Sequence, residues 1–205
     1  MKASMLRIPA VAVLMIGLSG CAWTPHQVKV APQVSVAPSD LGRDTKVFFR
    51  FTDERDDTTV GHRSVATVGA QITAPQLDDQ VQLQLKDSLQ KKGYQLVTSE
   101  AAADDTLTFR LRAFQFYIEK GYFSGGQEAS AVLAVDALRR GLTYTNVYRH
   151  NSDQRIQFVP GGDDIDAQMN LVLSDILQQA ATDTSLDAFL TGRAGGQTAA
   201  AAPPK

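Results

Sequence analysis

The chain has 205 residues, of which 43% are hydrophobic and 20% are charged, and its formal net charge at pH 7 is −2. This length suits one domain with a core of its own, and so small a charge excludes a strongly basic nucleic-acid-binding surface. The single cysteine excludes a disulfide within the chain.

Residues 1–20 predict a bacterial lipoprotein signal peptide. A short basic start precedes an apolar run over residues 8–17, which is too short to span a bilayer permanently. The run ends in a sequence that resembles a lipobox, Leu18-Ser19-Gly20-Cys21. In a lipobox the cysteine is diacylated and becomes the new N-terminus. We therefore expect a covalent lipid on Cys21; the alternatives are an ordinary signal peptide before an accidental cysteine, or a buried N-terminal helix.

The lipid anchor implies a location. Several acyl chains on one cysteine give essentially permanent membrane attachment. Ala22 follows the cysteine, and bacterial lipoproteins that lack aspartate there tend to reach the outer membrane. We expect an outer-membrane lipoprotein that faces the periplasm, has the membrane as its first partner and binds no nucleic acid.

Residues 21–45 predict a tether between the lipid and the domain. Three prolines and several polar residues interrupt it, while alternating valines allow part of it to lie along the domain as an edge strand. Fully extended, the segment would reach about 75 Å. At the other end, residues 193–205 are rich in glycine, alanine and proline and predict a disordered tail.

The first half of the domain, which we assign to residues 46–192, predicts two strands and a helix. Alternating apolar residues over 46–52 indicate a strand, followed by a charged turn that runs to Gly61 and a short strand over 62–68. Thr73-Ala-Pro-Gln76 resembles a capping box, and leucine and valine at four-residue spacing predict a helix over about 74–92 with Gly93 as its C-cap.

The second half predicts a series of strands and then two helices. The apolar pattern of the strand at 106–118 slips by one residue near Ala113, which indicates a β-bulge. Asn151-Ser-Asp153 predicts a turn between two strands. A long helix begins at about Gly161, and a short helix follows over 185–190. The remaining expected strands cover 94–97, 128–138, 142–149 and 155–159.

This order of elements predicts an α+β fold. We expect a mostly antiparallel sheet of about four to six strands, with two main helices packed on one face as a two-layer sandwich.

The sequence resembles the YajG-type family of uncharacterised Gram-negative lipoproteins. Besides the lipobox and the proline-punctuated valine segment, the resemblance rests on a strand that ends in an Asp-x-Arg turn before a glycine: Asp53, Arg55 and Gly61. It also rests on Lys92-Gly93-Tyr94 at a helix end, and on the stretch 183–190 that follows a helix containing Val172-Leu173-Ser174-Asp175. The resemblance implies a lipoprotein fold and location but no activity.

The acidic run 53–57 is the strongest candidate for chemistry. Paired carboxylates serve acid–base catalysis, and a run of oxygen ligands can bind calcium, but the spacing does not fit an EF-hand loop. We interpret Asp53, Arg55 and Gly61 as a structural turn. The three histidines, His26, His62 and His150, do not have metal-ligand spacing. We therefore expect no catalytic residue, metal or cofactor other than the lipid.

Tyr122 and Phe123 are the candidate interaction residues. They lie in a glycine-flanked connection, where exposed aromatic side chains can anchor a partner protein. The alternative is that they fold back over the end of the sheet.

Three functions remain open. The first is a non-enzymatic accessory or interaction module of the envelope, with a protein partner. The second is an auxiliary lipoprotein of a lipid-transport or surface-glycan assembly machine, and the third is a small envelope hydrolase with a pocket lined by Asp53, Arg55 and His62.

Overall fold

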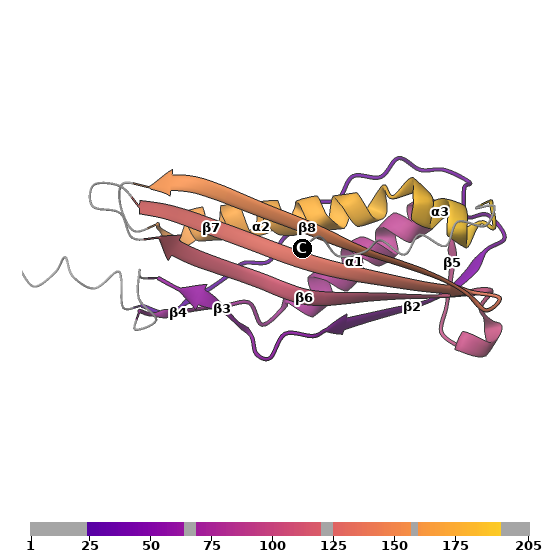
Figure 1. Cartoon of the computed structure of the whole chain (residues 1–205), viewed down its shortest axis with the longest axis horizontal. Coiled ribbons are helices and arrows are strands. Elements are labelled where there is room, and N and C mark those ends of the chain that lie inside the picture. The colour runs from indigo at the N-terminus through magenta and orange to yellow at the C-terminus, as the bar shows by residue number, and fades with distance from the viewer. Residues whose placement is uncertain (1–23, 64–68, 120–124, 157–159, 194–205) are drawn as a thin grey trace, which may run out of the picture.

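The computed structural model describes residues 24–63, 69–119, 125–156 and 160–193. Within these ranges the chain forms an eight-stranded sheet and three α-helices (Figure 1). In chain order the elements are β1 (His26–Gln27), β2 (Lys46–Asp53), β3 (Thr59–His62), β4 (Gln71–Thr73), α1 (Leu77–Lys91), β5 (Gln95–Val97), the 3₁₀ turn η2 (Glu100–Ala102), β6 (Asp105–Glu119), β7 (Gly125–Arg139), β8 (Leu142–Ile156), α2 (Gly162–Ala181) and α3 (Thr184–Leu190).

The helices pack on one face of the sheet, α2 against β7 and β8 and α1 against β2 and β5 (Figure 1). The α+β two-layer sandwich expected from the sequence is confirmed. Three strands of fifteen residues, β6, β7 and β8, form its long axis and pair antiparallel in that order. The other side of β6 pairs with β2 in parallel along its first half, and with β3 near its end. The sheet is therefore mixed, with parallel ladders beside the longer antiparallel ones.

The core lies between the sheet and the two long helices. Its largest buried side chains alternate along β6, where Phe109 and Phe114 are 1% exposed on either side of the bulge. The predicted stripe of α1 is confirmed, since Leu77, Val81 and Leu85 are buried. The predicted bulge is also found, because the β6–β7 register shifts between Leu111 and Ala113.

The predicted turn at residues 151–153 is wrong, because β8 runs through this stretch without interruption. Asn151 pairs with Ser130 and Asp153 with Glu128, so β7 supplies a partner at every position. The side-chain amide of Asn151 also donates to Glu128 at 2.8 Å. Residues of types that favour turns therefore stay extended here, because β7 is as long as β8 and pairs with it along its whole length.

The predicted start of the first helix is also wrong. Thr73 is the last residue of β4 rather than a helix cap, and its carbonyl accepts a hydrogen bond from Val28. The sheet therefore holds this residue, and α1 begins at Leu77 without a side-chain cap. The strand expected at 62–68 lies earlier, since β3 ends at His62 and residues 64–68 lie outside the described ranges.

The segment expected to be a tether is part of the fold from His26 onward. Residues 29–35 lie extended along α2 and form what we call the strap. Alternate backbone N–H groups of the strap donate to side chains spaced four residues apart on the helix: Lys29 to Asp166, Ala31 to Asn170, Gln33 to Ser174 and Ser35 to Gln178, at 2.7–3.2 Å. Asn170 and Gln178 also donate back to strap carbonyls.

Apolar contacts support the same placement. Val28 is 4% exposed, Pro32 is buried, and Val30 and Val34 pack against the core. At the start of α2, the imidazole of His26 contacts the Asp166 carboxylate at 2.7 Å. The expected reach of a free 24-residue spacer is therefore corrected, because most of that length is held against the domain. None of the helices among the described residues has the length and apolarity needed to cross a membrane.

The strap gives a first prediction. Gln178 bonds both the N–H and the carbonyl of Ser35, whereas its neighbour Gln179 is exposed. Gln178→Ala should lower the free energy of unfolding, measured by urea denaturation, by about 1 kcal/mol. The matched variant Gln179→Ala should change it by less than about 0.5 kcal/mol. Equal effects of the two variants would contradict a structural role for the strap.

Candidate functional site

Strand β2 ends at Asp53, whose carboxylate holds the following turn. The Arg55 guanidinium donates to it through Nε at 2.9 and 3.0 Å and through Nη2 at 2.6 Å. The Arg55 backbone N–H donates to the same carboxylate at 3.1 Å. The Arg55 side chain is only 7% exposed. The pair therefore has the bidentate geometry of a strong, oriented ion pair that fixes a turn.

The charge of Asp53 is stabilised by this contact. Burial alone would raise the pKa of the Asp53 carboxyl, but the hydrogen bonds from Arg55 outweigh it and hold that pKa below its ordinary value. Burial and the neighbouring Asp53 charge raise the pKa of Asp78 on α1. Asp53 is thus ionised, but its lowered pKa and the donors on its oxygens make it a weak general base, a role that favours a pKa near the working pH.

Gly61 belongs to β3 rather than to the turn itself. A Cβ at this position would lie 2.1 Å from the carbonyl oxygen of Phe116, the residue with which it pairs on β6. Only glycine allows the two backbones to approach so closely. Gly61 therefore joins the small β3–β4 ladder to the main sheet.

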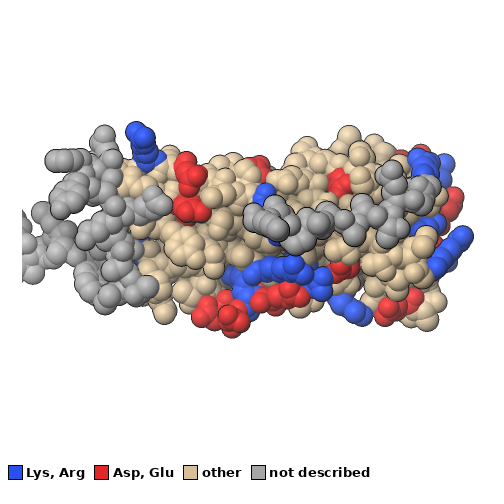
Figure 2. Space-filling view, viewed as in Figure 1, with Lys and Arg blue, Asp and Glu red and all other residues tan. Residues whose placement is uncertain are grey.

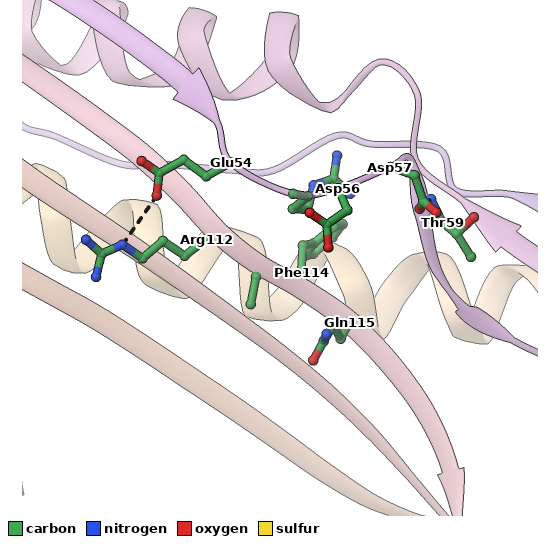
Figure 3. Close-up of a pocket in the computed structure, with 9 residues that line it drawn as sticks. Glu54, Asp56, Asp57, Thr59, Arg112, Phe114 and Gln115 are labelled. Carbon is green, nitrogen blue, oxygen red and sulfur yellow. Dashed lines mark hydrogen bonds and ion pairs between the residues drawn. The ribbon is translucent and has the colours of Figure 1, made fainter.

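A cavity of about 220 Å³ lies between this turn and the bulge of β6 (Figure 3). Its acidic residues are Glu54, Asp56 and Asp57, and Arg112 contacts Glu54 at 3.4 Å across one end. The remaining lining residues are Arg55, Thr59, Ala113, Phe114 and Gln115.

The cavity does not unite the three residues of the hydrolase hypothesis. Arg55 lines it, but Asp53 and His62 are not among its lining residues. Within the described residues, no three His, Cys, Asp or Glu side chains converge as metal ligands. The geometry that we observe here is that of a braced turn.

Asp183 forms a second cluster that the sequence analysis did not identify. Its Oδ2 accepts hydrogen bonds from the hydroxyls of Tyr144 and Tyr148, both at 2.6 Å, and from the Asn146 amide at 3.1 Å. Its Oδ1 caps α3 by accepting the N–H groups of residues 185 and 186. Burial alone would raise the pKa of Asp183, but these donors, led by the two tyrosines, lower it. Burial also raises the pKa of Tyr144 to about 12.

Two motifs that support the family resemblance meet in a third cluster. The Lys92 ammonium contacts both carboxylate oxygens of Asp187 at 2.7 and 2.8 Å, and the Tyr94 hydroxyl donates to the same carboxylate at 3.2 Å. Lys92 and Asp187 are 7% and 8% exposed. Lys92-Gly93-Tyr94 and the 183–190 stretch therefore fix α3 to the end of α1.

The other predicted site residues lie outside the described part of the chain. These are the lipidation site Cys21, the lipobox residues Leu18, Ser19 and Gly20, and the candidate interaction residues Tyr122 and Phe123. Their roles stay predictions.

The family model described as uncharacterized lipoprotein, Lipoprotein_16, matches residues 32–191. The chain belongs to this family. The YajG-type resemblance drawn from the sequence is thereby confirmed. The matched region begins within the strap and ends just after α3, so it includes all three clusters described above.

A solved structure with a TM-score above 0.5 supports the same fold, and two others with lower scores are also similar. A DUF330 protein from Xanthomonas campestris aligns with a TM-score of 0.54 and 11% identity, over 83% of this chain and 99% of that one. A neuraminyllactose-binding hemagglutinin homolog from Helicobacter pylori gives 0.46 and 9%, over 79% and 98%. An uncharacterised protein gives 0.44 and 16%, over 80% and 99%. A search of curated proteins finds no significant sequence match.

The adjacent lysines at the end of α1 give a second prediction. Lys92→Ala leaves the buried Asp187 carboxylate without its counter-ion and should cost about 3–5 kcal/mol in the free energy of unfolding. Lys91 pairs with Asp87 in solvent, so Lys91→Ala should cost less than about 0.5 kcal/mol. Chemical denaturation of both variants checks this, and a small effect at Lys92 would contradict the role assigned to the cluster.

A third prediction concerns pH. Asp105 is 2% exposed and bonds Arg139 at 2.6 Å, but its Oδ1 has no partner. Burial raises the pKa of Asp105 to about 6 from 3.8, with Arg139 acting in the opposite direction. A raised pKa means that the folded state favours the protonated form. The stability from this group is therefore fully present below about pH 4 and is lost as the pH rises through about 6.

Urea unfolding at pH 4.5 and pH 7.5 tests this sign. Between these values the wild type should lose about 2 kcal/mol more stability than Asp105→Asn, which has no proton to release. Asp104, the exposed neighbour, provides the control: its charge also raises the pKa of Asp105, but less than burial does, so Asp104→Asn should keep most of the pH dependence of the wild type. Identical pH profiles for the wild type and Asp105→Asn would refute the assignment.

Proposed function

We propose that this chain is a lipid-anchored lipoprotein of the outer membrane, that it faces the periplasm, and that it acts there as a non-enzymatic interaction module of the envelope. The observation that carries the proposal is the position of the strap relative to Cys21. Cys21 lies only five residues before His26, whose side chain contacts Asp166 near the start of α2.

This short spacing limits how far the domain can lie from a lipid on Cys21. Five extended residues span at most about 18 Å. A lipid on Cys21 would therefore hold the domain close to the membrane rather than at the end of a long spacer. The Leu18–Cys21 sequence and membership of a lipoprotein family both support the anchor.

The open face of the sheet supports an interaction role. Figure 2 shows Lys, Arg, Asp and Glu side chains gathered in a band along one side of the domain. Within the outward face, Arg110 contacts Asp136 and Glu54, and Arg112 also contacts Glu54. At the tip of the β7–β8 hairpin, Leu138 on this face is 47% exposed, and Leu142, whose position in the strand faces the helix side, is 65% exposed. Exposed apolar side chains beside charged groups suit a protein partner.

The anchor is tested first. Mass spectrometry of the mature wild type should find acylated Cys21 at the N-terminus, and Cys21→Ser should leave an uncleaved precursor or a soluble periplasmic form. An unmodified N-terminus at another residue would contradict the lipid anchor. Membrane fractionation of the wild type then distinguishes the outer membrane from the inner one.

The interaction role has a separate test, a crosslinking survey in the native envelope. Replacing Leu138 and Leu142 with serine should remove crosslinks to envelope proteins with little loss of thermal stability, because both side chains are exposed. Leu83→Ser on α1, at 58% exposure, is the matched control and should keep the crosslinks. Crosslinks confined to a transport or glycan-assembly machine would assign the chain to that machine. Loss of crosslinks in the control alone would contradict the role of the hairpin.

A further inference from the structure

Strand β8 is a long strand at the edge of the sheet. Among the described strands it pairs only with β7, and its fifteen residues contain no proline and no lysine, the residues that commonly protect edges. A groove of about 520 Å³ runs between β8 and α2 and includes Leu171, which is 50% exposed. An added strand would therefore find both free backbone groups and space for its side chains.

The hairpin turn determines which backbone groups of β8 are free. Arg140 and Gly141 form a two-residue turn with φ values of 49° and 82°, so the flanking pair Arg139 and Leu142 is a hydrogen-bonded pair. The β7–β8 register then continues without a shift. Even-numbered residues of β8 thus bond to β7, and the N–H and carbonyl groups of odd-numbered residues point away from the sheet.

The outward-facing odd-numbered side chains carry separated charges. Arg149 and Asp153 are exposed, and neither makes an ion pair within the described residues. Asp153 instead lies directly opposite Glu128 on β7, and like charges in this arrangement destabilise a sheet. This region of β8 therefore has one negative charge that lacks a cation and two cations, Arg149 and Arg155, that lack an anion within the described residues.

We infer that β8 pairs antiparallel with β8 of a second copy of this chain, centred on Asn151. In this register Arg149 of each copy faces Asp153 of the other, which forms two ion pairs related by a two-fold axis. A centre at residue 152 would place Arg149 against Arg155, and centres at 149 or 153 would place a charged residue against itself. A centre at 150 would pair neither charge. A centre at 154 would satisfy Asp153 with Arg155 but leave Arg149 without an anion. The register at Asn151 is the one that satisfies both residues.

The symmetry of this pairing agrees with the placement of the helices. A two-fold axis perpendicular to the sheet leaves the helix layers of both copies on the same side. His26 lies against the start of α2 in that layer, so both chains would enter their domains from one side of the dimer. Two copies on one membrane surface can therefore form this pair.

Disulfide crosslinking of the full-length chain in its membrane tests the inference. Asn151→Cys introduces a thiol on the axis, where the two Cα atoms of a hydrogen-bonded pair lie about 5.5 Å apart. Mild oxidation should convert most of the protein into a disulfide-linked dimer on non-reducing gels. Thr143→Cys is the control on the same strand. Its two copies would be about 50 Å apart, so it should stay monomeric. To exclude reaction at Cys21, both variants are compared with the unsubstituted chain.

Charge reversal then tests the register. In the Asn151→Cys background, Arg149→Asp or Asp153→Arg alone should reduce the dimer at least fivefold, and the two together should restore it. The melting temperature should not fall, because both side chains are exposed and Asp153→Arg removes the like charge opposite Glu128. Equal crosslinking at Asn151→Cys and Thr143→Cys would overturn the inference. Failure of the double reversal to restore the dimer, or a crosslink to a different protein in its place, would also overturn it.

Discussion

The hydrogen bonds between the strap and α2 depend on a match between two regular spacings. Two residues of extended chain advance about 6.6 Å, and four residues of α-helix advance about 6 Å. Because the lengths nearly agree, the N–H groups of Lys29, Ala31, Gln33 and Ser35 each meet a polar side chain one turn further along the helix. Pro32 fits this arrangement because its position falls between two donating residues. The match covers four donors, from Lys29 to Ser35.

Several other features follow from that contact. The strap enters beside β4, where β1 pairs with Ile72 and Thr73, and so joins the small ladder to the helix layer. Beyond it, Ser39 and Gly42 donate to the carbonyls of Lys91 and Lys92, next to the cluster that fixes α3. The segment thus connects both ends of the domain. Its contact with α2 at His26 lies five residues after Cys21, which is the basis for a module held close to its membrane.

Sequence reasoning identified the elements whose pattern is local. The apolar stripe of α1, the phase slip of β6 near Ala113 and the positive-φ Gly93 are each encoded within one segment, and each is found. Errors arose where a distant segment determines the conformation. Thr73 has the pattern of a helix cap but is held by Val28, and residues 151–153 have the pattern of a turn but are paired by β7.

The candidate sites show the same difference between contacts within one segment and contacts between distant segments. Asp53 and Arg55 are two residues apart, so their pairing could be anticipated, whereas Asp183 meets tyrosines that lie thirty-five or more residues away. No local pattern predicts that contact. The polar residues at 166, 170, 174 and 178 lie at helical spacing, but a polar stripe of this kind ordinarily indicates a solvent-facing surface, so it did not predict the strap.

Amide hydrogen exchange of the strap, resolved by residue, tests the account most directly. If alternate N–H groups are bonded to α2, exchange should be slow at Lys29, Ala31, Gln33 and Ser35 and fast at Val30 and Val34, for which no acceptor lies among the described residues. A free segment interrupted by proline would not show this two-residue alternation. Uniformly fast exchange over residues 29–35 would mean that the segment is a free tether, and the placement of the domain close to its membrane would then be wrong.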